Sequence, residues 1–318
     1  MTQPANRGKK TATAWKAGWS TDTGLQRASN EDRIFADPAG GTFLVVDGLG
    51  GHAAGEQAAE AAVQAISEHL DSTEGPPEKR IREAISEANN RIFLLAQTNP
   101  DWQGMACVLT LALVSEDAVT VGHVGDSRMY LMWNGNLRKL TSDHSPVGER
   151  EDRGELTESE AMMHPRRNEV FRDVGTRPRS ADDADFIEVR TFPFHPSAAL
   201  LLCSDGLSDV MTSAEIASIL ELYEDDAEAI AQQLVAAANE HGGTDNISVI
   251  FIAGEDFVGM HSTAMAESRM RHSITRTRRK RIHWRRHLQK ALWLVIGMAI
   301  GMGIWAACDR FLWRITGQ

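Results

Sequence analysis

Short apolar runs separated by polar turns fill most of this chain, and their spacing predicts a fold rich in strands. Most runs are too short for helices, are rich in β-branched residues and follow one another without a helical stretch between them. That order is typical of antiparallel sheets, because neighbouring antiparallel strands need only short connections. The predicted strands are 14–20, 33–35, 42–46, 105–114, 119–124, 129–133, 186–191, 200–203 and 247–252.

Longer amphipathic stretches come in two pairs and predict helices. Start signals precede the second helix of each pair, namely Pro76-Pro77 and Asp225-Asp226. Strands in runs with helices in pairs favour an α+β fold, and we predict a central antiparallel β-sandwich flanked by pairs of helices. The predicted helices are 54–70 with 77–97, and 213–222 with 225–240.

Residues 145–180 interrupt this pattern. They are polar, rich in Arg and Glu, and show little strand periodicity. We predict a partly helical surface excursion here, in a position where a flap over a substrate groove could sit.

The end of the chain differs from the rest. The stretch 291–308 holds eighteen residues, all apolar or glycine, and as a helix it would be about 27 Å long, near the thickness of a bilayer core. No polar stripe interrupts it, so we predict one C-terminal transmembrane helix. The expected parts are a flexible N-terminus at 1–14, one domain at 15–253, a basic linker at 254–290, the membrane helix at 291–308 and a short tail at 309–318.

Charge is divided just as sharply. The chain has 33 Lys/Arg and 44 Asp/Glu residues, and residues 269–318 hold twelve of these bases but only one of the acids. Residues 1–268 therefore hold 21 bases and 43 acids, a net charge of −22. Such an acidic body repels phosphate backbones, which argues against a nucleic-acid partner. The cysteines lie in apolar runs without the spacing of zinc or redox sites, and we expect them to be buried and inert.

The candidate chemistry lies in aspartates at the ends of β-forming runs, each within two residues of a glycine. They occur in Val46-Asp47-Gly48, Gly125-Asp126, Asp205-Gly206 and Gly243-Thr244-Asp245. Each alone reads as a turn. Four in one domain, each at the end of an apolar strand, suggest converging carboxylates, which Mg²⁺ and Mn²⁺ require.

At these residues the sequence resembles the PPM (type 2C) family of metal-dependent serine/threonine protein phosphatases. The matching strings keep the family's order and spacing across residues 15–253. They are Gly24-Leu25-Gln26-Arg27-Ala28-Ser29-Asn30-Glu31-Asp32, Val46-Asp47-Gly48-Leu49-Gly50-Gly51-His52, Gly125-Asp126-Ser127-Arg128, Ser204-Asp205-Gly206-Leu207-Ser208-Asp209 and Gly243-Thr244-Asp245-Asn246.

The resemblance implies hydrolysis of phosphoserine and phosphothreonine on proteins, opposing a protein kinase, with two and possibly three Mn²⁺ or Mg²⁺ ions. It implies that Asp47 bridges two ions and that the Gly48 carbonyl binds one of them. Arg27 would bind the substrate phosphate. The further metal ligands that it implies are Asp205 and Asp245, Glu31 and Asp32 directly or through water, and Asp126 and Asp209 with Asp205 at a third ion.

The proton donor to the leaving alkoxide stays open. Some family members carry a histidine directly after the Asp-Gly, but here Leu49 stands in that position. His52 is the nearest substitute, and a metal-bound water is the other candidate. A catalytically inactive, membrane-tethered binding module of the same fold remains the alternative, and a two-metal nuclease is opposed by the charge of the body.

We expect a single-pass protein of the bacterial inner membrane with its catalytic domain in the cytoplasm. Residues 1–14 lack a signal-peptide core, and ten basic residues precede the apolar stretch while two, Arg310 and Arg314, follow it. The expected partners are phosphoproteins, including a membrane kinase, and anionic lipid at the basic run. Gly297 and Gly301 form a GxxxG pattern that would allow a weak dimer.

Overall fold

The computed structural model describes residues 14–51 and 53–260. By its internal contacts the chain divides after residue 262, and everything described belongs to the first unit. The expected flexible N-terminus, most of the basic linker, the apolar stretch 291–308 and the tail lie outside the described residues. Within the described part, no helix is both long and apolar enough to cross a membrane.

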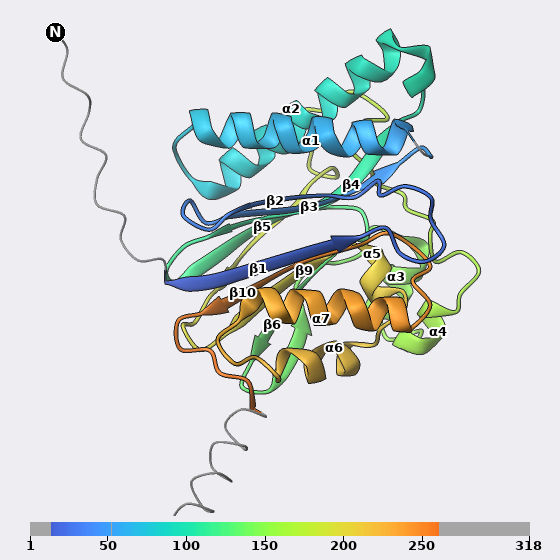
Figure 1. Cartoon of the computed structure of the whole chain (residues 1–318). Coiled ribbons are helices and arrows are strands. Elements are labelled where there is room, and N and C mark those ends of the chain that lie inside the picture. The colour runs from blue at the N-terminus through green and yellow to red at the C-terminus, as the bar shows by residue number, and fades with distance from the viewer. Residues whose placement is uncertain (1–13, 52, 261–318) are drawn as a thin grey trace, which may run out of the picture. The chain divides into compact units, whose positions relative to one another are not determined.

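Two five-stranded antiparallel sheets lie face to face, which confirms the predicted sandwich (Figure 1). One sheet has the order β1-β10-β9-β6-β7 and the other the order β2-β3-β4-β5-β8. The strands are β1 (Trp15–Asp22), β2 (Arg33–Asp37), β3 (Thr42–Leu49), β4 (Ala106–Val114), β5 (Ala118–Val124), β6 (Arg128–Trp133), β7 (Asn136–Lys139), β8 (Glu188–Pro193), β9 (Ala199–Cys203) and β10 (Ile247–Gly254).

Helices cover the outer faces of the sandwich. The pair α1 and α2 packs on the β2-β3-β4-β5-β8 sheet, and α6 and α7 pack on the other sheet, as predicted (Figure 1). Short helices α3, α4, α5 and η1 lie in the connections. The bounds are α1 (Ala53–Ser72), α2 (Pro77–Thr98), η1 (Pro100–Trp102), α3 (Pro146–Asp152), α4 (Glu158–Met162), α5 (Asp205–Ser208), α6 (Ser213–Leu220) and α7 (Ala227–Glu240).

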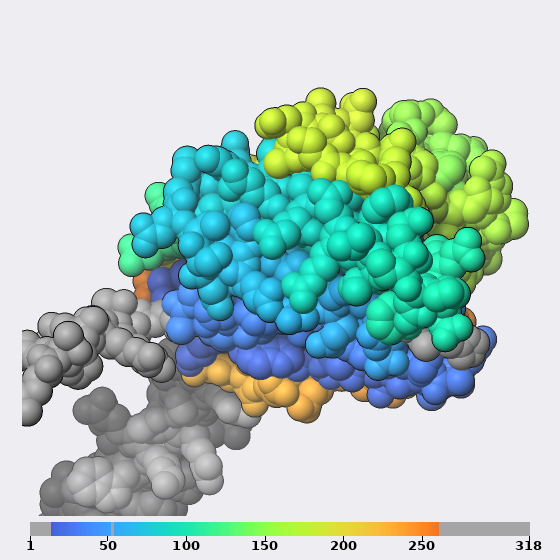
Figure 2. All heavy atoms as spheres, turned by 90° about the horizontal axis from the view of Figure 1, so that it is seen from above, coloured from blue at the N-terminus to red at the C-terminus, as the bar shows by residue number. Residues whose placement is uncertain are grey.

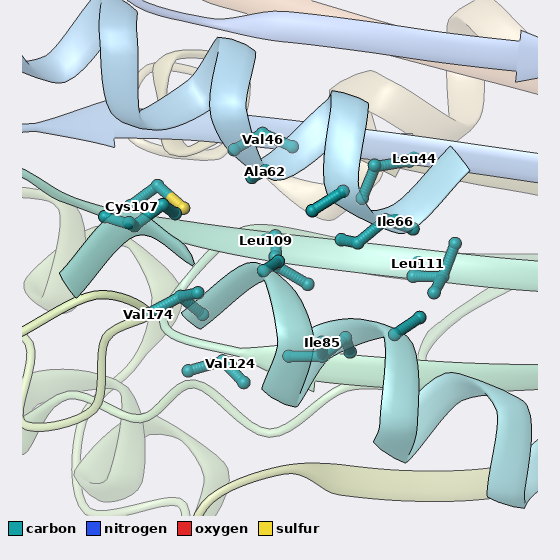
Figure 3. Close-up of a cluster of buried hydrophobic side chains, with 14 of the residues drawn as sticks. Leu44, Val46, Ala62, Ile66, Ile85, Cys107, Leu109, Leu111, Val124 and Val174 are labelled. Atoms are coloured by element: carbon teal, nitrogen blue, oxygen red, sulfur yellow. The ribbon is translucent and has the colours of Figure 1, made fainter. Parts of the chain in front are cut away.

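The central strands are buried on both faces, which explains their continuous apolar sequences. Along β3, Leu44 and Val46 pack in the cluster under α1 and α2, while Phe43 and Val45 pack in the cluster between the sheets. Alternate side chains of a strand point to opposite faces, so every second residue packs against the helices and the others pack against the second sheet. Figure 3 shows the helix-side cluster, in which Leu44 lies beside Ile66 and Val46 beside Ala62.

Strand β7 is the element that the apolar pattern missed. Its residues alternate between exposed and half-buried, since it is a short polar strand at the edge of its sheet. A local signal was nevertheless present. Asn134 and Gly135 have positive φ values of 51° and 73°, and Asn-Gly between two strands is the strongest short-range hairpin signal.

The excursion at 145–180 contains two short helices, α3 and α4, followed by irregular chain, as predicted. Its far end is tied to the body. Val174 forms an isolated bridge with Cys107, and buried Asn89 of α2 accepts from Gly175 N (2.8 Å) and donates to Arg177 O (2.8 Å). In Figure 2 the excursion, coloured green to yellow, lies beside the layer of α1 and α2.

Candidate metal centre

One end of the sandwich collects the acidic residues. Strand β3 ends just after Asp47, β5 ends before Asp126, β9 ends before Asp205, and β10 begins after Asp245. The antiparallel register brings these four ends together, because Leu49 pairs with Ala106 and Val249 pairs with Cys203. The turn between β1 and β2 adds Arg27, Glu31 and Asp32 at the same end.

A cavity of about 170 Å³ opens between these strand ends. Seven of the ten predicted site residues line it, namely Arg27, Glu31, Asp47, Gly48, Asp126, Asp205 and Asp245. Asn168 and Val170 of the excursion also line it, and no periodicity in the sequence singled them out. Asp32 lies behind the cavity and is 2% exposed. His52 lies outside the described residues.

A second, smaller cavity adjoins the first. Asp126 and Asp205 line both, and in the second they are joined by Asp209, the last of the predicted ligands. Its volume of about 20 Å³ is enough for roughly one water molecule or ion. The three aspartates assigned by resemblance to a third ion therefore do meet, beside the main cavity.

Glycine is needed where the strand ends approach one another. A Cβ on Gly48 would lie 2.2 Å from Gly55 O of α1 and 2.8 Å from Glu31 O. A Cβ on Gly206 would lie 1.9 Å from Asn246 O. The glycines next to Asp47 and Asp205 therefore allow these backbone segments to approach one another closely.

Asn246 holds the turn between β1 and β2 against the start of β10. Its amide donates to Thr23 O (2.8 Å) and Ser29 O (2.9 Å), and its Oδ1 accepts from Glu31 N (2.8 Å). Sequence reasoning included Asn246 only as part of a motif. Its role could not be predicted from the sequence, because its hydrogen-bond partners lie more than 200 positions away in the chain.

Ser204 positions Asp32 in a similar way. Its hydroxyl donates to Asp32 Oδ2 (2.8 Å) and accepts from Ser248 N (3.0 Å). The Asp32 carboxylate is thereby fixed behind Asp205, the residue that follows Ser204.

Burial and mutual repulsion raise the pKa values of five of the clustered carboxyl groups, those of Asp32, Asp47, Asp126, Asp205 and Asp209. Burial is the largest cause for each, and neighbouring acids add to it. The pKa values of Asp47 and Asp205 lie well above the ordinary range. Burial raises the pKa of Asp126 to about 7, with Asp143 and Asp209 adding to the shift, and that of Asp32 to about 6 against the lowering effect of its serine partners.

Two arginines from loops offset part of this negative charge. Arg27 donates to Asp245 Oδ2 at 2.6 Å, and its side chain is 48% exposed. Arg167 of the excursion donates from Nε to Asp209 Oδ2 at 2.8 Å. Arg167 was not among the predicted residues, since an arginine in an Arg-rich segment carries no distinguishing signal.

The donor set fits hard divalent cations. Among the buried carboxylate oxygens of the described residues, Asp32 Oδ1 and Asp205 Oδ1 have no hydrogen-bond partner. In residues 14–51 and 53–260, no group of three or more acidic, histidine or cysteine side chains is arranged so that it could hold a metal ion. A bound Mg²⁺ or Mn²⁺ would therefore need water ligands as well, and these ions do take a few carboxylates and keep several waters.

Cys107 and Cys203, the cysteines of the described residues, are not suited to nucleophilic chemistry at this centre. Burial raises the pKa of the Cys203 thiol to about 12 and that of the Cys107 thiol further still. Both thiols are therefore protonated at neutral pH, as expected for inert core residues.

Comparison with known proteins agrees with this fold and site. The protein phosphatase 2C family matches residues 26–239. The chain is 37% identical over 246 residues to the serine/threonine phosphatase stp of Listeria welshimeri, covering 74% of this chain and 94% of that protein. It is 36% identical over 232 residues to PstP of Mycobacterium tuberculosis, covering 72% of this chain and 43% of that protein.

Solved structures agree as well. The crystal structure of M. tuberculosis PstP/Ppp aligns with a TM-score of 0.68 at 31% identity, covering 76% of this chain and 99% of that one. A PstP catalytic domain in complex with two manganese ions aligns with a TM-score of 0.66 at 29% identity, covering 75% and 97%. The fold and the carboxylate centre thus define a metal-dependent phosphatase domain. The chain belongs to the protein phosphatase 2C family.

Mn²⁺ binding should be linked to proton release. A carboxyl group with a raised pKa is protonated on the acidic side of that pKa, and the ion must displace its proton. With pKa values of about 6 for Asp32 and about 7 for Asp126, and raised pKa values for Asp47 and Asp205, the apparent Mn²⁺ affinity should rise with pH between 5.5 and 7.5. Titration calorimetry in two buffers of different ionisation enthalpy measures the protons released. Equal affinity at pH 5.5 and 7.5 would contradict the linkage.

Proposed function

We propose that this chain is a metal-dependent protein phosphatase that hydrolyses phosphoserine and phosphothreonine on proteins. One observation carries the proposal: a half-exposed arginine, Arg27, meets a cluster of buried carboxylates in a single cavity. A phosphate dianion needs a cationic fork, and hard metal ions need carboxylates. The names of the relatives, serine/threonine phosphatases of several bacteria, support the substrate class.

The acidic residues would hold the ions. Asp47, the Gly48 carbonyl, Asp205 and Asp245 would hold ions in the main cavity, and Glu31 and Asp32 would bind them directly or through water. Asp126, Asp205 and Asp209 would hold a third ion in the adjoining cavity. When bound, two such ions supply a water activated for in-line attack on phosphorus at neutral pH.

Arg27 would orient the substrate at the mouth of the cavity. Its planar guanidinium has five donors and uses one on Asp245, so others remain for phosphate oxygens. The proton for the departing alkoxide would come from His52 or from a water. Neither requires a covalent intermediate, which agrees with the protonated, buried thiols.

Asp47→Asn should lower the kcat/KM of Mn²⁺-dependent phosphopeptide hydrolysis by at least about a hundredfold, the usual effect of losing one preorganised charge at a reacting centre. The substitution keeps the shape of the side chain but removes its charge. Phosphate release from a phosphoserine peptide, with Mn²⁺ varied, measures the loss.

Asp117→Asn is the matched control, since Asp117 lies in the turn between β4 and β5 at the opposite end of the sandwich. It should behave as wild type. Full activity of Asp47→Asn would overturn the metal assignment. A wild-type protein that binds Mn²⁺ but releases no phosphate would support the inactive binding module in place of the enzyme.

Arg27→Ala should mainly raise KM, by about tenfold, because its contacts to phosphate exist before and during the reaction. Arg27→Lys should recover part of the loss, since an ammonium supplies charge without the bidentate fork. The exposed Arg138 of β7 provides the control substitution to alanine. If KM stays unchanged while Mn²⁺ affinity collapses, Arg27 serves the metal centre and not the substrate.

We also propose that residues 291–308 anchor the enzyme in the bacterial inner membrane, with the catalytic domain in the cytoplasm. The charge asymmetry of the sequence on the two sides of this stretch supports the orientation. The basic run would contact anionic lipid headgroups. The anchor would hold the enzyme near membrane phosphoproteins, including a serine/threonine kinase, and Gly297 with Gly301 would pack two copies weakly.

Full-length protein should stay with membranes in high salt and in carbonate, conditions that release surface-bound proteins. A variant with Val295→Arg and Ile300→Arg should shift to the soluble fraction, because each arginine at mid-bilayer depth costs about 2.5–3.5 kcal/mol on the insertion scale. Immunoblots of the fractions measure the distribution, and crosslinking of the membrane fraction detects the dimer. Wild-type protein that washes off in carbonate would rule out the anchor.

A further inference from the structure

His144 is a buried histidine that the chemistry above does not use. It lies between β7 and α3, at the start of the excursion, and is 5% exposed. Its backbone N–H donates to Gly125 O (2.6 Å), and its ring Nδ1 accepts from Gly125 N (3.0 Å). One residue therefore satisfies both backbone groups of the glycine that directly precedes Asp126.

The hydrogen bond from Gly125 fixes the tautomer of the His144 ring. Because Nδ1 accepts a backbone N–H, it carries no proton, and the ring proton must be on Nε2. Nε2 faces Glu188 Oε2 of β8 at 3.6 Å, the one carboxylate paired with it among the described residues. The Arg172 guanidinium, 3.3 Å from Nε2, is then a neighbour and not a donor to it.

Gly125 itself has little freedom. Its φ is +109°, and a Cβ would lie 2.2 Å from the side chain of Val108. The peptide group that leads into Asp126 is therefore defined by β4 on one side and by His144 on the other. Asp126, 9% exposed, lines both cavities of the centre from this position.

The same histidine also contacts the excursion. Its backbone oxygen accepts from Phe171 N at 2.9 Å, and the two rings lie 6.2 Å apart. Asn168 and Val170, which line the metal cavity, directly precede Phe171. His144 thus connects the segment that overhangs the site with the strand end that carries Asp126.

We propose that His144 is a positioning residue that sets the backbone before Asp126, and so the affinity of the cation that Asp126 helps to hold. This proposal rests on the proposed function for the identity of the site. His144 would act through its hydrogen bond, because its ring Nδ1 is the acceptor that holds the Gly125 N–H in place. A histidine that only fills space would not need an acceptor at this atom.

Two amide substitutions of His144 distinguish a positioning role from a role that only fills space. In His144→Asn the side-chain oxygen can take the place of Nδ1, whereas in His144→Gln the longer side chain carries its polar atoms to the place of Nε2. Outer-shell changes typically weaken metal binding about 10–100-fold. His144→Gln should therefore weaken the weakest Mn²⁺ site of the full-length protein by about tenfold or more, and His144→Asn by less than about threefold.

Mn²⁺ binding is measured by calorimetry and by electron paramagnetic resonance of free Mn²⁺, per mole of folded protein, and thermal unfolding without metal is measured in parallel. Equal Mn²⁺ affinity of the Asn and Gln variants, with equal losses of Tm, would overturn the proposal. His195→Gln is the control. His195 follows β8 at the opposite end of the sandwich, where it contacts Ser197 and Trp133.

Glu188 offers a second test if the His144 variants fail to fold. Glu188→Gln keeps an acceptor for Nε2–H and should leave Mn²⁺ binding unchanged, while Glu188→Leu removes it and should weaken the same site about threefold or more. Identical binding by both variants would count against the proposal. Direct Mn²⁺ binding is independent of turnover, so a wild-type protein without phosphatase activity would refute the proposed function but not this one.

Discussion

Repulsion among buried carboxylates is the constraint on which the rest of this structure depends. The seven acidic residues assigned to the ions lie at one end of the sandwich together with Arg27 and Arg167. Two like charges 4 Å apart repel by about 4 kcal/mol at an effective dielectric constant of 20, so the cluster cannot be fully ionised without cations. Burial and this repulsion together raise the pKa values of the acids. The favourable contribution of Asp32 and Asp126 to folding is therefore present at acidic pH and is lost as pH rises through their folded-state pKa values of about 6 and 7. Bound divalent ions would replace the protons as the balancing charge.

The two sheets make this concentration of charge possible. Strands buried on both faces cannot shift in register without exposing an apolar layer, so their ends are fixed points. Aspartates placed just beyond those ends are held close together by the hydrophobic core and not by any attraction of their own. Gly48 and Gly206 then remove the last steric obstacle. The energy that assembles the centre therefore comes from apolar burial elsewhere in the domain.

The sequence predicted the rigid parts of this arrangement and missed the parts that depend on long-range contacts. Apolar periodicity located the central strands and both helix pairs, because burial on both faces leaves a continuous signal. It missed β7, whose signal lay in the Asn134-Gly135 turn. Asp47, Asp126, Asp205 and Asp245 were predicted because they lie at the ends of predicted strands, and Glu31, Asp32 and Asp209 were predicted from the family resemblance. Arg167, Asn168 and His144 were not, since their partners lie far away in the sequence and their neighbours have no periodic pattern.

The position of each charged group in the fold explains how the centre can be stable and still bind metal ions and phosphate. The carboxylates stand on strand ends, where backbone hydrogen bonds and core packing hold them. The cations, Arg27 and Arg167, stand on a turn and on the excursion, and 48% of the Arg27 side chain is exposed. Partly exposed ion pairs contribute about 0–1 kcal/mol, so each arginine can exchange its carboxylate for another anion at little cost. Carboxylates held at strand ends, with arginines in weak ion pairs beside them, allow metal ions and a phosphate group to bind at the same site.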